Sequence, residues 1–252
     1  MLEFDNVCFQ YDVDDYAIMD KLSFQIQDGE FVCVIGPSGC GKSTIFRLVN
    51  KLLTPDAGRV LVNGQQIESL KNYCGYMPQH DLLFPWRTVR ENVMLPMEIQ
   101  SGYTKAEMLE RADKALASVG LSDWGQKSPR ELSGGMRQRA AFARTVLTGS
   151  DLLLLDEPFS ALDYQTRLTV SADIAAMIRK AEKSVILITH DLAEAISLAD
   201  RVLILSARPA RVKAEFPIHL TAADHSPLAA RRAPEYGQLF NQIWEELSNE
   251  NN

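Results

Sequence analysis

Residues 36–44 read GPSGCGKST, which fits the pattern G-x-x-x-x-G-K-[ST] at every fixed position. An apolar run precedes this string at residues 31–35, and residues 45–49 continue it with a sequence that suits a helix. A strand, a glycine-rich loop and a helix in this order present backbone N–H groups that cradle phosphate oxygens. An ordinary strand-to-helix turn needs neither a lysine nor hydroxyls at this spacing. The string therefore predicts a strand-loop-helix unit that binds phosphate.

This loop and the helix after it are expected to bind the phosphates of a nucleoside triphosphate. A helix start adds unpaired N–H groups and the positive end of the helix dipole. Lys42 is expected to reach the terminal phosphates, and Ser43 is expected to hold a magnesium ion. The residues assigned to this contact are Gly36, Pro37, Ser38, Gly39, Cys40, Gly41, Lys42, Ser43 and Thr44.

Composition narrows the class of protein. The chain has 252 residues, 46% of them apolar, which is enough to build a sizeable core. Its formal net charge of −7 argues against a general nucleic-acid binder, which would carry a basic surface. The four cysteines form no C-x-x-C pair, so neither a zinc site nor a disulfide framework is expected. We also expect no secretory signal and no membrane-spanning run.

Hydrophobic patterns predict two kinds of sheet. Residues 1–30 alternate apolar and polar, which indicates antiparallel strands closed by an Asp28-Gly29 turn, and Asn63-Gly64 marks a hairpin. Continuous apolar runs at residues 152–155 and 185–188 are typical of buried strands, with a helix between them at about 164–182. Strands that alternate with helices predict a parallel sheet covered on both faces. Residues 202–205 and 212–216 are expected to complete it.

A helical insert interrupts this pattern. Strand signals vanish between residues 88 and 149, and residues 105–119 repeat apolar side chains at helical spacing. The chain is therefore expected to be an α/β protein with an N-terminal antiparallel subdomain and an inserted helical subdomain at about 84–149. We predict one domain over residues 1–216 and a short tail over 217–252, with a helical patch at 236–247.

Two carboxylates end the leucine run at residues 152–155. In open parallel sheets, ligands bind at the carboxyl ends of strands, which is where Asp156 and Glu157 are expected. Asp156 is predicted to hold magnesium, directly or through water. Glu157 is predicted to act as the general base that polarises an attacking water.

A second anion-binding device lies at residues 132–139, which read LSGGMRQR. Ser133 is expected to cap the following helix, and Gly134 and Gly135 leave its first N–H groups open to an anion. This string is far in sequence from the phosphate loop. Two phosphate-binding devices in one chain need an explanation.

The chain resembles the ATP-binding subunits of ABC transporters along essentially its whole length. LSGGMRQR is similar to the signature motif of that family, and it is highly specific beside the phosphate loop. The resemblance implies a P-loop NTPase core and a pair of subunits that stack head to tail. Each ATP is then held between the phosphate loop of one subunit and the signature motif of the other. ATP and magnesium are the implied ligands, and a homodimer is the simplest assembly.

The same resemblance assigns roles to further residues. Gln79 resembles the glutamine that touches magnesium and water, and Asp163 lies in a string, SALD, similar to the loop that crosses the dimer interface. His190 resembles the switch histidine that contacts the γ-phosphate. Tyr11 resembles the aromatic residue that stacks on adenine, with Tyr16 as the alternative.

Cys40 adds an expectation about reactivity. At its position in the phosphate loop, the side chain is expected to lie exposed near the nucleotide. A thiol there predicts inhibition by alkylating reagents and protection by ATP.

Residues 79–93 resemble bacterial importer ATPases of the nitrate, sulfonate and taurine group, which includes carriers of pyrimidine thiamine precursors. Many members carry Gly where Ser160 stands. Residues 79–86 are expected to form a groove for a short helix of the membrane partner, with an apolar surface from Leu82, Leu83, Phe84 and Trp86. The implied partners are permease subunits and, indirectly, an external solute-binding protein, with the chain on the cytoplasmic face of the membrane.

Other interpretations stay open at this point. An exporter ATPase has the same motifs, and some ABC ATPases act away from membranes, on DNA or ribosomes. Those chains usually carry long coiled-coil inserts or two fused nucleotide domains, and neither pattern is present in this acidic chain. A chain that binds ATP without turnover is disfavoured because Glu157 and His190 are both intact.

Overall fold

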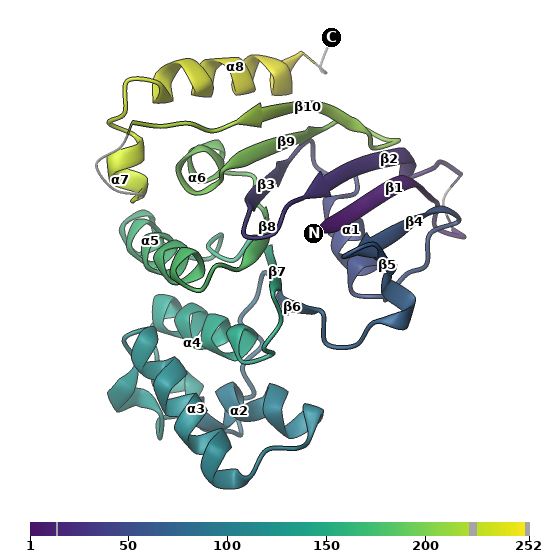
Figure 1. Ribbon diagram of the computed structural model, residues 1–252. Coiled ribbons are helices and arrows are strands. Elements are labelled where there is room, and N and C mark those ends of the chain that lie inside the picture. The colour runs from purple at the N-terminus through teal and green to yellow at the C-terminus, as the bar shows by residue number, and fades with distance from the viewer. Residues whose placement is uncertain (14, 222–225, 250–252) are drawn as a thin grey trace. The chain divides into compact units, whose positions relative to one another are not determined.

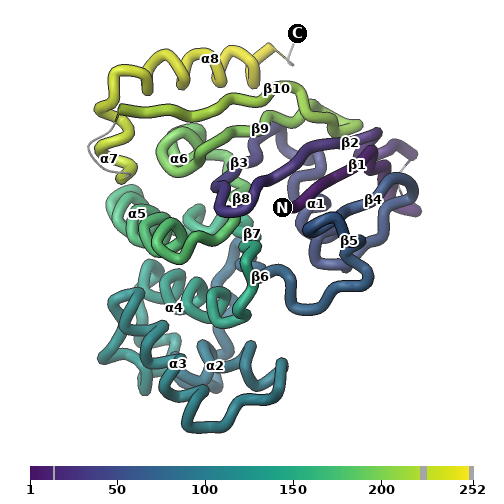
Figure 2. Tube along the Cα trace, viewed as in Figure 1, coloured from purple at the N-terminus to yellow at the C-terminus, as the bar shows by residue number. Residues whose placement is uncertain are grey.

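The computed structural model describes residues 1–13, 15–221 and 226–249. The chain divides into two compact units. Figures 1 and 2 colour it by residue number, from purple at the N-terminus to yellow at the C-terminus. The first unit comprises Met1–Tyr73 and Lys183–Asn252, and the second comprises Cys74–Glu182. These limits differ from the predicted insert at residues 84–149, because the second unit also holds two strands and a long helix.

An antiparallel sheet forms one part of the first unit. Its strands, in the spatial order β2-β1-β4-β5, are β2 (Met19–Ile26), β1 (Leu2–Phe9), β4 (Ala57–Val62) and β5 (Gln65–Gln66). Apolar residues of β1 and β2 alternate toward the core, where Phe4 and Phe24 lie opposite each other and stack with ring centroids 4.6 Å apart. The alternation read from the sequence is thus confirmed as an antiparallel pair.

Two turns around this sheet were predicted, with different outcomes. Asn63 and Gly64 join β4 to β5 with φ values of 52° and 73°, as a two-residue hairpin turn requires. The Asp28-Gly29 turn, however, does not close the antiparallel pair. It leads from β2 into β3, a strand of another sheet, because residues 31–35 are apolar without alternation and need burial on both faces.

Parallel strands form the rest of the core of the first unit. β3 (Phe31–Ile35) lies between β8 (Ser184–Ile188) and β9 (Arg201–Leu205), and it is parallel to both. β10 (Val212–Pro217) adds an antiparallel edge beside β9. Every residue of β3 and β8 is buried, which explains their continuous apolar sequences.

The helices of the first unit flank this sheet. α1 (Lys42–Val49) follows β3, and α6 (Leu192–Leu198) follows β8 and packs on β3. α7 (Pro227–Ala230) and α8 (Tyr236–Ser248) both pack on α6, and the predicted helical patch at residues 236–247 is confirmed. A short 3-10 turn, η1 (Ile67–Ser69), lies after β5.

The second unit joins a parallel strand pair to a group of helices. β6 (Cys74–Met77) and β7 (Leu152–Asp156) are parallel neighbours. Four helices accompany them, namely α2 (Val89–Gln100), α3 (Lys105–Ser118), α4 (Gly134–Val146) and α5 (Tyr164–Lys180). Two 3-10 turns, η2 (Ser122–Trp124) and η3 (Pro129–Glu131), lead from α3 to α4.

The helical stretch of the second unit begins at clear sequence signals. Thr88 with Glu91 and Thr104 with Glu107 form capping boxes at the starts of α2 and α3. α2, α3 and α4 pack on one another. The predicted α/β fold, with an antiparallel N-terminal sheet, parallel strands and a separate group of helices, is confirmed. None of the helices in the described part of the chain has the length and apolar character that crossing a bilayer requires.

Candidate nucleotide-binding site

Parallel pairing places two functional segments of the first unit side by side. β3 and β8 run in register, with Val34 opposite Ile188. The phosphate loop leaves the carboxyl end of β3, and His190 lies just beyond the carboxyl end of β8. In open parallel sheets this edge is where ligands bind. The sheet therefore brings together two segments that are more than 140 residues apart in the chain.

The phosphate loop holds its lysine over its own backbone. Lys42 Nζ donates hydrogen bonds to the carbonyl oxygens of Gly36 at 2.8 Å and Pro37 at 2.9 Å. No acidic side chain lies in the first turn of α1, so the positive end of its dipole is not compensated there. Ser43 is exposed at this helix start. The arrangement presents an ammonium group, a hydroxyl and a helix N-terminus to an anion.

The expectation about Cys40 is wrong. Its side chain is only 1% exposed. A methyl group built on Gly36 would lie 3.1 Å from Cys40 Sγ, so the thiol packs against the base of the loop. Alkylating reagents cannot reach a thiol in that position without opening the loop. The residue still belongs to the loop, but as a packing group.

Tyr11 is tied to the start of α1. Its hydroxyl lies 3.2 Å from Thr44 Oγ1 and accepts a hydrogen bond from Arg47 Nη1 at 3.0 Å. Its ring meets Phe9 edge-on, with centroids 4.9 Å apart. Tyr16, the alternative, is 77% exposed. The structure thus places Tyr11 beside the phosphate loop, and its contact with adenine stays a prediction.

The segment around His190 is fixed by its neighbours. The buried Thr189 hydroxyl donates to Glu194 Oε2 at 2.7 Å, and it accepts from the Asp191 N–H at 3.0 Å. Asp191 caps α6 by accepting from the N–H groups of Ala193 and Glu194. His190 itself is exposed. We did not predict a role for Glu194, which is buried, from the sequence. Its only sequence signal is its place as an acidic residue in the first turn of α6.

The second unit repeats this design with its own strand pair. β6 and β7 run in register, with Met77 opposite Leu155, so the residues that follow them are neighbours. Gln79 Nε2 donates to Glu157 Oε2 at 3.2 Å and to Ser160 Oγ at 3.3 Å. The Tyr76 hydroxyl donates to Asp156 Oδ2 at 3.1 Å. The structure thus brings Gln79 and Glu157 together, although the two residues are far apart in the sequence.

Backbone strain marks Glu157 as a special position. Its φ of 44° lies in the left-handed region, which costs a residue other than glycine about 1–3 kcal/mol. The Ser160 hydroxyl donates to the Glu157 carbonyl at 2.9 Å and so stabilises this turn. The turn directs the carboxylate toward Gln79. An oriented carboxylate at a strand end can accept a proton from a water molecule.

Residues 79–86, which we call the 79–86 segment, are held mainly through their backbone. Arg144, on α4, donates to the carbonyl oxygens of Leu82 at 2.8 Å and Asp81 at 2.6 Å. Burial lowers the pKa of the Arg144 guanidinium. From α2, the Asn92 amide group accepts from the Phe84 N–H at 2.6 Å and donates to the Phe84 carbonyl at 3.1 Å.

A further ion pair connects this segment to the signature string. Arg137 Nε lies 3.0 Å from Asp81 Oδ2, and Arg137 Nη1 donates to the Leu132 carbonyl at 2.8 Å. Leu132 immediately precedes Ser133. Neither Arg137, Arg144 nor Asn92 was singled out in the sequence, because their partners are mostly backbone groups that no motif specifies.

The signature string begins α4 as expected. Ser133 Oγ accepts from the Met136 N–H at 3.3 Å and caps the helix. The buried Gly135 faces α5 closely, because a methyl group built on it would lie 2.6 Å from Thr166 Cγ2. Asp163 caps α5 by accepting from the Thr166 N–H at 3.1 Å. Hydrogen bonds from Thr166 lower the pKa of the Asp163 carboxyl.

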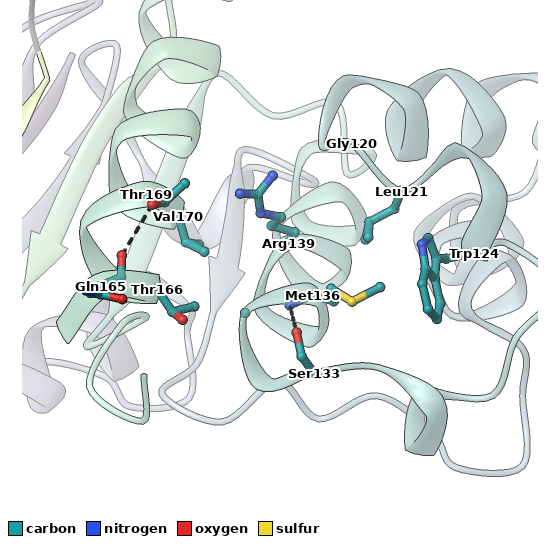
Figure 3. A pocket seen from close by; sticks show the side chains of 11 residues that line it. Gly120, Leu121, Trp124, Ser133, Met136, Arg139, Gln165, Thr166, Thr169 and Val170 are labelled. Atoms are coloured by element: carbon teal, nitrogen blue, oxygen red, sulfur yellow. Dashed lines mark hydrogen bonds between the residues drawn. The ribbon is translucent and has the colours of Figure 1, made fainter. Parts of the chain in front are cut away.

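A cavity of about 490 Å³ opens between α4 and α5 beside the signature string (Figure 3). Figure 3 shows Arg139 of α4 extending toward Thr169 and Val170 of α5, whereas the Met136 side chain extends toward Trp124. Arg139 also pairs with Asp173 of α5 at 2.6 Å. The lining residues are Gly120, Leu121, Trp124, Ser133, Gly135, Met136, Arg139, Gln165, Thr166, Thr169 and Val170. Two predicted anion-binding residues, Ser133 and Gly135, thus border a space that the sequence did not reveal.

Comparisons with known proteins identify what this arrangement is similar to. A family model described as "ABC transporter" matches residues 19–160. The nitrate import ATP-binding protein NrtD of Synechocystis sp. is 39% identical over 89% of this chain and 86% of that protein. The formylaminopyrimidine import ATP-binding protein ThiZ of Halalkalibacterium halodurans is 42% identical over 83% of this chain and 81% of that protein.

Among solved structures, the chain is similar to a dimer of the ATP-binding cassette MJ0796 in a post-hydrolysis state with ADP and Pi. The TM-score is 0.75 at 27% identity, and the match covers 87% of this chain and 99% of that one.

Arg144→Met is expected to loosen the 79–86 segment. Loss of two hydrogen bonds from a charged donor should speed amide exchange at Leu83 and Phe84 at least tenfold, or about 1.4 kcal/mol of local opening. Hydrogen–deuterium exchange measures this directly. The control is Arg130→Met, which alters an exposed arginine of the same unit. Equal exchange in both variants would contradict the assigned role of Arg144.

Gly135→Ala tests whether packing against α5 requires the glycine. The added methyl group should destabilise the chain by about 1–3 kcal/mol through its contact with Thr166. Thr166→Ser removes the Cγ2 methyl group that the added methyl group at position 135 would contact. In a chain that carries Thr166→Ser, Gly135→Ala should therefore cost at most half as much free energy of unfolding. Urea unfolding of the unchanged chain, the two single variants and the double variant measures the coupling energy between the two positions. Additive effects of the two substitutions would show that the contact does not govern this position.

Proposed function

Because the chain belongs to the ABC transporter family, we propose that it hydrolyses ATP to energise a membrane importer. The observation that best supports ATP hydrolysis is the hydrogen bond between Gln79 and Glu157, whose backbone is strained, at the carboxyl ends of β6 and β7. The first unit carries the phosphate loop and His190, and the second unit carries Gln79 and Glu157. Each group in this set has a defined part in phosphoryl transfer to water.

The proposed reaction proceeds by attack of water on the γ-phosphorus of ATP. Glu157 accepts the proton of that water, and Gln79 orients both the carboxylate and the water. The bond from the γ-phosphorus to the bridging oxygen breaks, which leaves ADP and phosphate. Lys42 and the N–H groups of the loop offset the negative charge on the phosphate oxygens, and His190 contacts the γ-phosphate. Tyr11 supports the adenine.

A magnesium ion suits the residues assigned to it. Ser43, Gln79 and Asp156 all offer oxygen atoms, which are the ligands that magnesium prefers. In the described part of the chain, no cluster of three or more His, Cys, Asp or Glu side chains could hold a metal ion. Magnesium is commonly bound through one or two carboxylates beside phosphate oxygens and water, so the single carboxylate of Asp156 suits it without a larger acidic cluster. When bound, the ion neutralises charge on the β- and γ-phosphate oxygens.

We further infer a homodimer in which two copies share each ATP. The signature string, with Ser133, Gly134 and Gly135, is a second anion-binding device in a chain that already has a phosphate loop. The solved cassette MJ0796 is described as dimeric with ADP and Pi, which supports this assembly. In a head-to-tail pair, the phosphate loop of one copy binds the nucleotide that the other copy contacts through its signature string. Asp163 lies at that interface.

The 79–86 segment is the proposed docking surface for the membrane partner. Trp86 is 76% exposed and Leu82 is 59% exposed. The Trp86 ring stacks on Phe84, with centroids 4.9 Å apart, so the exposed ring is held in place. Leu83, expected on this surface, is instead buried, because the turn at Leu82, with φ of 45°, directs neighbouring side chains differently.

The proposed docking surface also indicates where in the cell the chain acts and which other proteins it works with. Apolar and aromatic side chains that are exposed and rigid are typical anchors for a protein helix. The partner helix belongs to an integral membrane permease, which places the chain at the cytoplasmic face of the membrane as a peripheral subunit. An external solute-binding protein takes part only through that permease.

The transported solute is proposed from similarity alone. Similarity to a nitrate import protein supports a small anion such as nitrate, sulfonate or taurine. Similarity to a formylaminopyrimidine import protein supports, as the alternative, a pyrimidine precursor of thiamine. An exporter ATPase is the remaining alternative, because the site residues do not depend on the direction of transport.

Glu157→Gln should bind ATP, dimerise with it and lose turnover by a factor of at least about 100, because the amide accepts no proton. Size-exclusion chromatography with ATP and phosphate release measure the two effects. The control is Glu245→Gln, which changes the same charge on α8 of the first unit. Turnover retained by Glu157→Gln would exclude Glu157 as the base.

Trp86→Ala is expected to weaken attachment to the membrane without changing the unfolding midpoint, because this ring is exposed. The fraction of the chain that sediments with cell membranes should fall at least fivefold if the ring is an interface anchor. The matched control is Ile99→Ala, which removes a residue of the same unit that is 75% exposed. Equal sedimentation of both variants would exclude Trp86 as an anchor.

A further inference from the structure

The loop that joins β9 to β10 reaches the phosphate loop of the first unit. This loop, residues 206–211, follows the residues matched by the family model, which end at 160. Its sequence, SARPAR, contains Arg208 and Arg211. We call it the β9–β10 loop. None of the roles described above uses it.

Hydrogen bonds within the β9–β10 loop give it a defined shape. The Ser206 N–H donates to the Arg211 carbonyl at 2.9 Å, and the Arg211 N–H donates to Ser206 Oγ at 3.0 Å. Ser206 Oγ also lies 2.9 Å from the Ala207 carbonyl oxygen and 3.2 Å from that of Pro209. The loop closes on itself, so an exposed side chain at its tip projects from a fixed base.

The base of the loop is anchored where the phosphate loop also packs. The Ala210 N–H donates to the Ile18 carbonyl at 2.7 Å, and Arg211 forms an ion pair with Asp20. A methyl group built on Gly41 would lie 2.8 Å from Ile18 Cγ2, so Ile18 also touches the phosphate loop. The β9–β10 loop and the phosphate loop therefore share one support.

From this base, Arg208 binds the phosphate loop directly. Arg208 Nε donates to the carbonyl oxygen of Gly39 at 2.5 Å. Gly39 has a φ of 79°, a left-handed conformation that turns the loop there. A methyl group built on Gly39 would lie 3.7 Å from Arg208 Nη2, so the guanidinium covers this turn.

We propose that Arg208 is a positioning residue for nucleotide binding, which stabilises the phosphate-binding shape of the loop from its outer side through the Gly39 carbonyl. This inference rests on the proposed function, because it takes the loop to bind the phosphates of a nucleotide. Nothing in the motifs or in the comparisons assigns this role to the β9–β10 loop.

Two physical effects follow from this contact. A peptide whose carbonyl accepts a charged hydrogen bond becomes more polarised, so its N–H, here that of Cys40, donates more strongly to the Pro37 carbonyl at 3.3 Å and reinforces the turn of the phosphate loop. The contact also holds the turn at Gly39, so less conformational freedom is lost when phosphate binds. Both effects favour the nucleotide complex, and both need a charged donor that reaches the Gly39 carbonyl.

Titration calorimetry with ADP and magnesium on the full chain tests the proposal. Arg208→Gln should weaken ADP binding about fivefold, because glutamine is too short to reach Gly39 and carries no charge. Arg208→Lys should recover part of the affinity. The matched control is Arg232→Gln, which removes the same charge from an exposed arginine of the same unit outside the β9–β10 loop. It should change ADP affinity less than twofold.

The outcomes separate the inference from the proposed function. ADP affinity of Arg208→Gln within twofold of the unchanged chain would overturn the inference, as would an equal loss in Arg232→Gln. Lys42→Ala serves as the reference for the loop itself and should abolish measurable binding. Normal ADP binding by Lys42→Ala would refute the assigned role of the phosphate loop, and with it this inference. Loss in Lys42→Ala alone would leave the proposed function intact.

Discussion

In-register parallel pairing of buried strands decides where the functional groups of this chain lie. β3 pairs with β8 and β6 pairs with β7, and the carboxyl ends of both pairs carry functional residues. β3, β7 and β8 are buried along nearly their whole length, so a shift of one residue would move apolar side chains out of their positions in the core. The pairing therefore fixes the phosphate loop beside His190, and Gln79 beside Glu157.

A hydrogen-bonded network connects three functions within the second unit. Gln79 contacts Glu157, the 79–86 segment presents the exposed Trp86, and Arg137 joins Asp81 to the residue before the signature string. Arg144 and Asn92 hold the backbone between these points. A displacement of the exposed segment would thus act on Glu157, the proposed general base, and on the signature string together.

Much of the fold, and the segments that carry the predicted site residues, could be predicted from the sequence, because their signals are contiguous. Buried strands appear as apolar runs, and the phosphate loop and signature string combine glycines with specific polar residues at fixed spacing. Asn63-Gly64 predicted its hairpin for the same reason, since both residues tolerate positive φ.

The errors and omissions share a different physical cause. The direction of the Cys40 and Leu83 side chains depends on local turns, which residue type does not specify, and both are buried rather than exposed. Arg144 and Arg208 act through backbone atoms of residues that are distant in the sequence, and such contacts leave no pattern. Such residues become visible only when the fold brings their partners close.

Uptake of solute by living cells tests most directly whether this ATPase energises an importer. Cells that lack the chain would be given labelled nitrate, taurine, an alkanesulfonate and a pyrimidine precursor of thiamine, one at a time. The account predicts that uptake of one solute is lost, and that the unchanged chain restores it whereas Glu157→Gln does not. Normal uptake of all four solutes would contradict the assignment to this importer group.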